Sequence, residues 1–180
     1  MAAITHPDYA ALVDPLFRYA EKRVGENVFI KLDYNYMSST PNIRLTVPFF
    51  MVRDMEASLE FYIGKLGFKM THQWAPREKI EWCSVERDAA TLMLQEPRDS
   101  AKFDLEGEHG KGVSICFQCA DALALYHEFM AKGVEIKEPF VGNNMWVVAF
   151  NDPNGYRLDF ESATDVEEET RYSEWSPLTP

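Results

Sequence analysis

The sequence has few of the residues on which most nucleophilic and metal chemistry depends, with three cysteines and four histidines in 180 residues. An odd number of thiols and the lack of a signal pattern at the N-terminus predict a reducing compartment, so we expect a cytoplasmic protein. Cys116 and Cys119 have the spacing of a redox or zinc motif. They fall within an apolar segment and no second pair exists, which favours thiols of the core.

Basic residues are also in short supply, since 18 Lys and Arg face 29 Asp and Glu and the formal net charge is -11. This balance makes a nucleic-acid partner unfavourable. It is compatible with a cationic ligand, or with charge that serves solubility alone. No apolar run approaches the length of a membrane span, so we expect no membrane partner. A hydrophobic content of 46% is enough for a buried core.

One strand-then-helix pattern occurs twice, at Thr46–Phe68 and again at Gly112–Val134. Each copy has an apolar run, an aspartate suited to an N-cap (Asp54 or Asp121), apolar residues at helical spacing and a closing glycine. Strand-like segments follow each helix, at Lys69–Trp74, Ile80–Val85, Ala90–Gln95, Met145–Asn151 and Tyr156–Glu161. The sequence therefore predicts an α+β fold in which two β-α-β-β-β modules pair around a shared open cavity.

The repeat defines the predicted domain, residues 45–163, with modules at 45–97 and 112–162 and an exposed connection between them. Residues 1–44 form an N-terminal extension with a predicted helix at 8–24 and an alternating strand at 28–37, which is either an edge strand or an arm on a second subunit. Residues 164–180 are an acidic tail that we expect to be solvated, with docking of Trp175 as the alternative.

Strand alternation predicts which side chains face the cavity. In the first module these are Val47, Phe49, Met51, Thr91, Met93 and Gln95, with Trp82 as a further candidate; in the second they are Ser114, Cys116 and Gln118. Pro153 and Gly155 favour a type I turn at residues 152–155. We expect this turn to pair Phe150 with Arg157, Val148 with Asp159 and Trp146 with Glu161, which would place all six on the cavity face.

Four stretches in this order resemble the vicinal-oxygen-chelate superfamily, which includes glyoxalase I, extradiol dioxygenases and the bleomycin and fosfomycin resistance proteins. They are VPFFMVRD followed by EFY and KLGF, then DAATLMLQ, then DALALYHEF, and finally FNDPNGYRLDF. The resemblance covers Thr46 to about Ala163 and is greatest to the bleomycin resistance proteins. It implies the paired-module fold, and a homodimer with ligand grooves at the subunit contact.

Metal-dependent members of this superfamily place a His, Gln or Glu at one inward position on each of four strands. The resemblance maps these positions to Val47, Met93, Ser114 and Asp159. An aliphatic chain, a thioether, a hydroxyl and one carboxylate do not hold a divalent ion against water. None of the histidines maps to a ligand position; these are His6, His72, His109 and His127. We therefore expect no metal and no cofactor.

These expectations predict a metal-free protein of the bleomycin-resistance type that sequesters a cationic, aromatic small molecule, with no catalytic residues. An acid/base pair of Asp159 and Glu161 is disfavoured because Arg157 is placed to neutralise them. The predicted ligand-binding residues are Phe49, Met51, Trp82, Met93, Gln95, Ser114, Cys116, Gln118, Trp146, Val148, Phe150, Arg157, Asp159 and Glu161. Two alternatives stay open. One is a metal-dependent lyase or isomerase of the glyoxalase type, or a dioxygenase relative. The other is a structural or regulatory module whose groove its own extensions fill.

Overall fold

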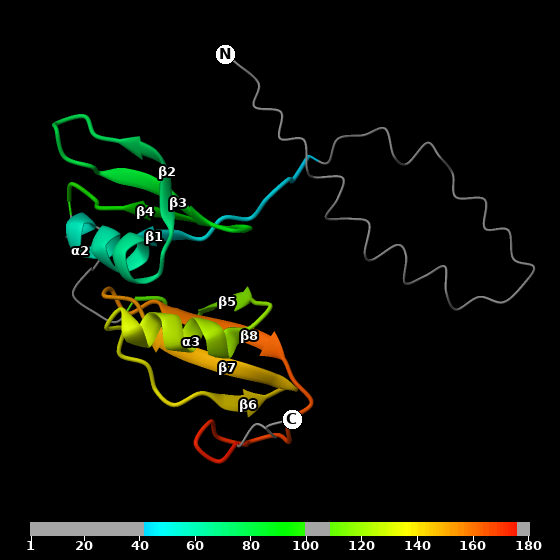
Figure 1. The fold of residues 1–180 in the computed structure, drawn as a ribbon. Coiled ribbons are helices and arrows are strands. Elements are labelled where there is room, and N and C mark those ends of the chain that lie inside the picture. The colour runs from blue at the N-terminus through cyan, green and yellow to red at the C-terminus, as the bar shows by residue number, and fades with distance from the viewer. Residues whose placement is uncertain (1–41, 100–108, 176–180) are drawn as a thin grey trace, which may run out of the picture. The chain divides into compact units, whose positions relative to one another are not determined.

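The computed structural model describes residues 42–99 and 109–175, and these contain both copies of the repeat (Figure 1). The helix predicted at 8–24 and the strand predicted at 28–37 lie outside the described residues. None of the helices in the described ranges combines the length and the apolar composition that crossing a bilayer requires.

The first module follows the predicted β-α-β-β-β order. Asp54 caps its helix as expected, because the carboxylate accepts a hydrogen bond from the Ala57 backbone N–H at 3.0 Å. The helix continues as a π-helical segment and ends before Gly67, whose φ of +73° is costly for residues with a Cβ. Its elements are β1 (Phe49–Met51), α2 (Met55–Leu59), η2 (Glu60–Lys65), β2 (Lys69–Trp74), β3 (Trp82–Arg87) and β4 (Ala90–Gln95).

The second module repeats this order and its capping. The Asp121 side chain accepts from the Ala124 N–H at 2.9 Å, and Gly133 has a φ of +74° just past the helix end. Its elements are β5 (Ser114–Gln118), α3 (Ala122–Ala131), β6 (Phe140–Gly142), β7 (Met145–Asn151) and β8 (Arg157–Ala163). The internal repeat and the α+β fold class predicted from the sequence are confirmed.

Each module forms a four-stranded mixed sheet, with strand orders β1-β4-β3-β2 and β5-β8-β7-β6. In each module the first strand runs parallel to the last one, β1 to β4 and β5 to β8. The remaining strand pairs are antiparallel. Equivalent strands thus occupy equivalent places in the two sheets, as expected when one sequence pattern is used twice.

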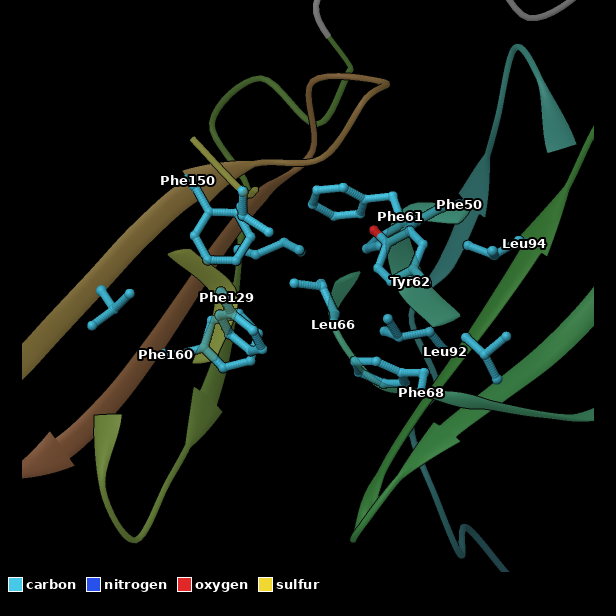
Figure 2. Packing of buried hydrophobic residues seen from close by; sticks show 14 of the residues in the cluster. Phe50, Phe61, Tyr62, Leu66, Phe68, Leu92, Leu94, Phe129, Phe150 and Phe160 are labelled. Carbon is cyan, nitrogen blue, oxygen red and sulfur yellow. The ribbon is translucent and has the colours of Figure 1, made fainter. Parts of the chain in front are cut away.

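One hydrophobic core serves both modules. Phe50, Leu92 and Leu94 project from the first sheet, and Phe150 and Phe160 project from the second toward them (Figure 2). Aromatic rings from the helices lie between these two sets; Phe61 is 6.2 Å from Phe150 and Phe129 is 5.1 Å from Phe160, between ring centroids. Because the helix-bearing faces of both sheets share this core, the opposite face of each sheet looks outward.

The loop between β7 and β8 joins the second module to the first. Tyr62 on η2 donates its hydroxyl to Asp152 at 3.0 Å, and both groups are buried. The Arg53 N–H donates to Asn154 at 2.9 Å, and the Tyr156 ring stacks on Phe50 with centroids 4.2 Å apart. These contacts fix the relative position of the modules with buried polar groups that are all paired.

A reciprocal contact comes from the β3–β4 turn of the first module. The Arg87 guanidinium pairs with Glu128 on α3 at 2.8 Å and lies over the Phe129 ring at 5.5 Å. Hydrogen bonds from Arg87, and also from Lys132, hold the pKa of Glu128 below its usual value. Each module therefore sends the turn before its last strand onto the helix region of the other.

Residues 164–175 pack against the second module. The backbone of this segment bonds to β6 and the residue before it, with Val141 N donating to Thr170 O at 2.9 Å and Tyr172 N donating to Pro139 O at 2.9 Å. The Trp175 ring lies 5.4 Å from Trp146. The expectation of a solvated end is wrong for these residues, because aromatic burial and backbone pairing outweigh the acidic composition; the docking of Trp175 is what occurs.

Candidate functional site

The outward side of the first sheet carries a row of aromatic and thioether side chains, which we call the first open face. Strand register places Phe49 beside Met93, and places Met51, Gln95 and Trp82 next to one another across β1, β4 and β3. Phe49 is 43% exposed, whereas its neighbour Phe50 is buried in the core. The predicted placement of these five residues on one face is confirmed, and their role in binding stays a prediction.

Trp74 also lies on the first open face, and sequence reasoning missed it. It is the cross-strand partner of Trp82, and 52% of its surface is exposed. A register shift between Met70 and His72 in β2 moves Trp74 by one position relative to the start of the strand. The presence of a tryptophan in each of two neighbouring strand-like segments could have indicated this pair. Alternation alone could not, because a bulge reverses the faces of the residues that follow it.

The outward side of the second sheet is polar and acidic, and we call it the second open face. The parallel pair β5–β8 sets Ser114 beside Arg157, Cys116 beside Asp159 and Gln118 beside Glu161. All six were predicted to share one face, and this is confirmed. They were also predicted to line one cavity together with the residues of the first open face, and within a single chain this is wrong, because both sheets turn their helix-bearing faces to the common core.

Hydrogen bonds orient both carboxylates of the second open face. Asp159 accepts from the Ser114 hydroxyl and from Arg157 Nε, the latter at 2.9 Å. Glu161 accepts from Cys116 Sγ and from Gln118 Nε2, both at 3.0 Å. Arg157 thus neutralises Asp159 as expected. The expectation that it also neutralises Glu161 is wrong, because the donors to Glu161 are the uncharged Cys116 and Gln118, which leave its carboxylate without a cationic partner on the face.

The predicted pairing of β7 with β8 is wrong, and it moves three predicted ligand-binding residues into the core. Phe150 pairs with Leu158, Val148 with Phe160 and Trp146 with Ser162, all on the buried side. Trp146, Val148 and Phe150 are 4%, 0% and 7% exposed. The face prediction fails for these three, and they are not part of the candidate site.

The hairpin loop explains this error. Gly155 N donates to Asp152 O at 3.0 Å, so the expected turn forms. Asp152 N also donates to Tyr156 O at 2.9 Å, which leaves a three-residue loop closed by Gly155 at a φ of +97°. This odd-numbered loop shifts the pairing by one residue, and a shift of one exchanges the two faces of a strand. Val147, Ala149 and Asn151 occupy the outward positions instead.

The thiols and histidines near the site are not arranged for nucleophilic catalysis. Partial burial and the adjacent Glu161 carboxylate raise the pKa of the Cys116 thiol to about 11, so it is protonated at neutral pH. His127 contacts the Tyr172 hydroxyl at 3.0 Å, and His72 contacts Thr71 at 3.2 Å. His109 stacks near Tyr156. The contacts of His127 and His72 therefore do not involve Ser114 or Cys116.

The four positions that correspond to metal ligands in the family do not form a donor set. Ser114 and Asp159 bond to each other on the second open face, and Asp159 is further engaged by Arg157. Met93 lies on the first open face, beside β1, and Val47 precedes that strand. No group of three or more His, Cys, Asp or Glu side chains suited to a metal ion occurs within residues 42–99 and 109–175. The residues present do not fit a divalent metal.

Two hollows adjoin the second open face. One of about 1280 Å³ is lined by Val147, Ala149 and Arg157 from this face and by β6 residues at its edge. The other, of about 830 Å³, lies between the β3–β4 turn and α3 and includes Cys116 and Gln118. Each hollow adjoins the second open face at one edge, and neither is lined by Asp159 or Glu161.

Solved structures with the same fold are similar to this chain over about two thirds of its length. They include UcmS2 (TM-score 0.56, 19% identity, 67% of this chain and 98% of that one). TnmS3, an antibiotic-binding protein from Streptomyces sp. CB03234, matches with a TM-score of 0.53 at 18% identity, over 69% and 100% of the chains. A bleomycin-binding protein complexed with bleomycin matches with a TM-score of 0.53 at 19% identity, over 67% and 98%.

No curated protein sequence matches the chain significantly. The model of one protein family matches residues 44–160, which span both modules. The chain belongs to the Glyoxalase/Bleomycin resistance protein/Dioxygenase superfamily.

Proposed function

We propose that this protein binds a small molecule with an aromatic part and a cationic part, and sequesters it without a metal ion and without chemical conversion. The observation that carries the proposal is the contrast between its two open faces. The first presents Phe49, Trp74 and Trp82 for stacking, and the second presents the charged Glu161 carboxylate. Aromatic walls with a few oriented charges are the usual construction of a ligand site.

Sequestration requires affinity and no reacting group. A dissociation constant near 1 μM corresponds to about 8 kcal/mol, to which stacking on the aromatic face and one oriented charge pair both contribute. The absence of a suitable donor set among the described residues supports a role without a metal. So do the similar folds of an antibiotic-binding protein and a bleomycin-binding protein.

The site is proposed to be completed by a second copy of the chain. Both open faces look away from the core that the modules share, so an aromatic face and an acidic face oppose each other when they come from two chains. The proposal therefore predicts a homodimer, twice the 20.7 kDa of the chain, with two equivalent grooves. Light scattering on purified protein tests this, and a monomer at all concentrations that still binds ligand would contradict it.

Quenching of tryptophan fluorescence by bleomycin and other cationic aromatic compounds tests the binding. We expect saturable quenching by one class of compound, weakened about five- to tenfold in Glu161→Gln because one charge pair is lost. Glu56→Gln, which removes an exposed carboxylate at the start of α2, is the matched control and should bind like the parent protein. Equal loss in both variants would show that net charge, not the second open face, drives binding.

Metal analysis addresses the enzymatic alternative. Protein purified without chelator, and again after exposure to Ni²⁺ or Zn²⁺, should contain well under one equivalent of metal. Stoichiometric metal retained through dialysis, and lost in Asp159→Asn, would overturn the metal-free proposal in favour of a glyoxalase-type enzyme.

A further inference from the structure

An arginine is stacked on the exposed indole of the first open face. The guanidinium carbon of Arg98 lies 5.2 Å from the centre of the Trp74 ring. Trp74 keeps 52% of its surface exposed despite this contact, so part of the indole is available to a ligand. Its cross-strand neighbour Trp82 extends the same aromatic surface toward Gln95.

Arg98 is held over the indole by a buried carboxylate. Its Nε donates to Glu81 at 2.7 Å, and Glu81 is 5% exposed. Arg77 donates to the other oxygen of Glu81 at 2.9 and 2.5 Å, so two guanidinium groups share one carboxylate. Burial would raise the pKa of Glu81, but the bonds from Arg98 and Arg77 outweigh it and hold the pKa below its usual value. The carboxylate therefore stays charged and keeps Arg98 in place near neutral pH.

A cation already occupies the π-system of Trp74. A guanidinium bound to an aromatic ring uses the negative potential of that ring and adds a fixed positive charge beside it. A second cation at this indole is repelled, whereas an anionic or electron-rich planar group is attracted and can still stack on the exposed part.

We propose that Trp74 and Arg98 form a subsite for a planar aromatic group bearing negative charge, so that the ligand carries its cationic group at a separate point. This inference rests on the proposed function, because it assigns the chemistry of one end of that ligand. The cationic end belongs to Glu161 on the second open face, and the planar anionic or electron-rich end belongs to Trp74.

Two probes with the same naphthalene ring and opposite charge test the subsite, naphthalene-2-sulfonate and 2-naphthylmethylammonium. Binding is followed by NMR at the four indole N–H signals of the ¹⁵N-labelled full chain, with Trp74 assigned from Trp74→Phe. We expect the sulfonate to shift the Trp74 signal at lower concentration than the ammonium. In Arg98→Gln the ratio of the two dissociation constants should change about tenfold toward the ammonium.

Arg77→Gln is the matched control, because it removes the other guanidinium from the same carboxylate without touching the indole. Its ratio should stay within about twofold of the parent value, which separates stacking from general charge. Equal ratios in the parent protein and Arg98→Gln, or an equal change in both variants, would overturn the subsite. If bleomycin binds and depends on Glu161 while neither probe shifts Trp74, the subsite fails and the proposed function stands. If bleomycin and its class also fail to bind, the proposed function fails instead.

Discussion

Removing the Tyr62 hydroxyl with Tyr62→Phe should weaken the contact between the two modules. Tyr62 is fully buried and donates to Asp152 at 3.0 Å. A hydrogen bond to a charged group contributes about 1.5–3 kcal/mol. Asp152 keeps donors from Asn154 and Tyr156 backbone N–H groups at 2.8 and 2.9 Å, so it is not left without partners. We therefore expect a loss of about 2 kcal/mol in the free energy of unfolding.

Urea denaturation measured by circular dichroism gives this difference directly, and the thermal midpoint should fall by about 8 °C for a folded unit of this size. Tyr172→Phe is the control, because its hydroxyl makes an exposed contact with His127 at 3.0 Å. We expect this control to lose under about 0.5 kcal/mol. A loss in Tyr62→Phe no larger than in the control would refute the argument that this bond secures the modules.

The same variant has a pH signature. Burial, and then the charge of Asp152, raise the pKa of Tyr62 well above its usual value. In the unfolded chain Tyr62 ionises near pH 10 while the folded chain keeps its proton, so the stabilisation is complete below about pH 10 and is lost as pH rises further. The loss is about 1.4 kcal/mol per pH unit for one group. Tyr62→Phe lacks this component, so its stability should fall less steeply between pH 10 and 11.

Three further outcomes follow from the structure. The rate of Cys116 alkylation by iodoacetamide, read by mass spectrometry, should rise about tenfold per pH unit from pH 7 to 9, because the pKa of this thiol is about 11. The rate should be higher in Glu161→Gln, which lacks a carboxylate that raises this pKa. A rate that levels off by pH 8 would contradict this. Acrylamide should quench less fluorescence after Trp74→Phe than after Trp146→Phe, because Trp74 is half exposed and Trp146 is 4% exposed; the reverse order would restore the pairing predicted from the sequence. Phe61→Ala should cost about 3–5 kcal/mol in chemical denaturation, since this buried ring of the first module packs against Phe150 of the second, and a loss below about 1 kcal/mol would contradict a shared core.

Local features were predictable from the sequence because they depend on neighbouring residues. The N-caps at Asp54 and Asp121 need one carboxylate three positions before a free N–H group, and both form as predicted. The strands Lys69–Trp74 and Ala90–Gln95 have the predicted bounds. Alternation then assigned Phe49, Met93 and their neighbours to one face, since side-chain direction along an unbroken strand has a period of two.

Register across the β7–β8 hairpin was predicted wrongly because one residue more or less in a loop reverses every side chain that follows. The sequence indicated the turn at Asp152–Gly155, but the additional Asp152–Tyr156 pairing depends on contacts that Asp152 and Tyr156 make with Tyr62 and Met51 in the other module. The bulge in β2 likewise hid Trp74. Both are places where long-range packing selects among local conformations of similar energy.

The sequence by itself determined the repeated module, its capped helices and the chemistry of the residues at the family's ligand positions, because each depends on residue type and short-range spacing. Tertiary structure decided that Trp146, Val148 and Phe150 belong to the core and that Trp175 docks beside them. It also decided that Arg98 and Trp74, which are distant in the sequence, meet at one end of the first open face. Such contacts join segments that are not neighbours in the chain, so they depend on how the strands pair and pack, which no local pattern encodes.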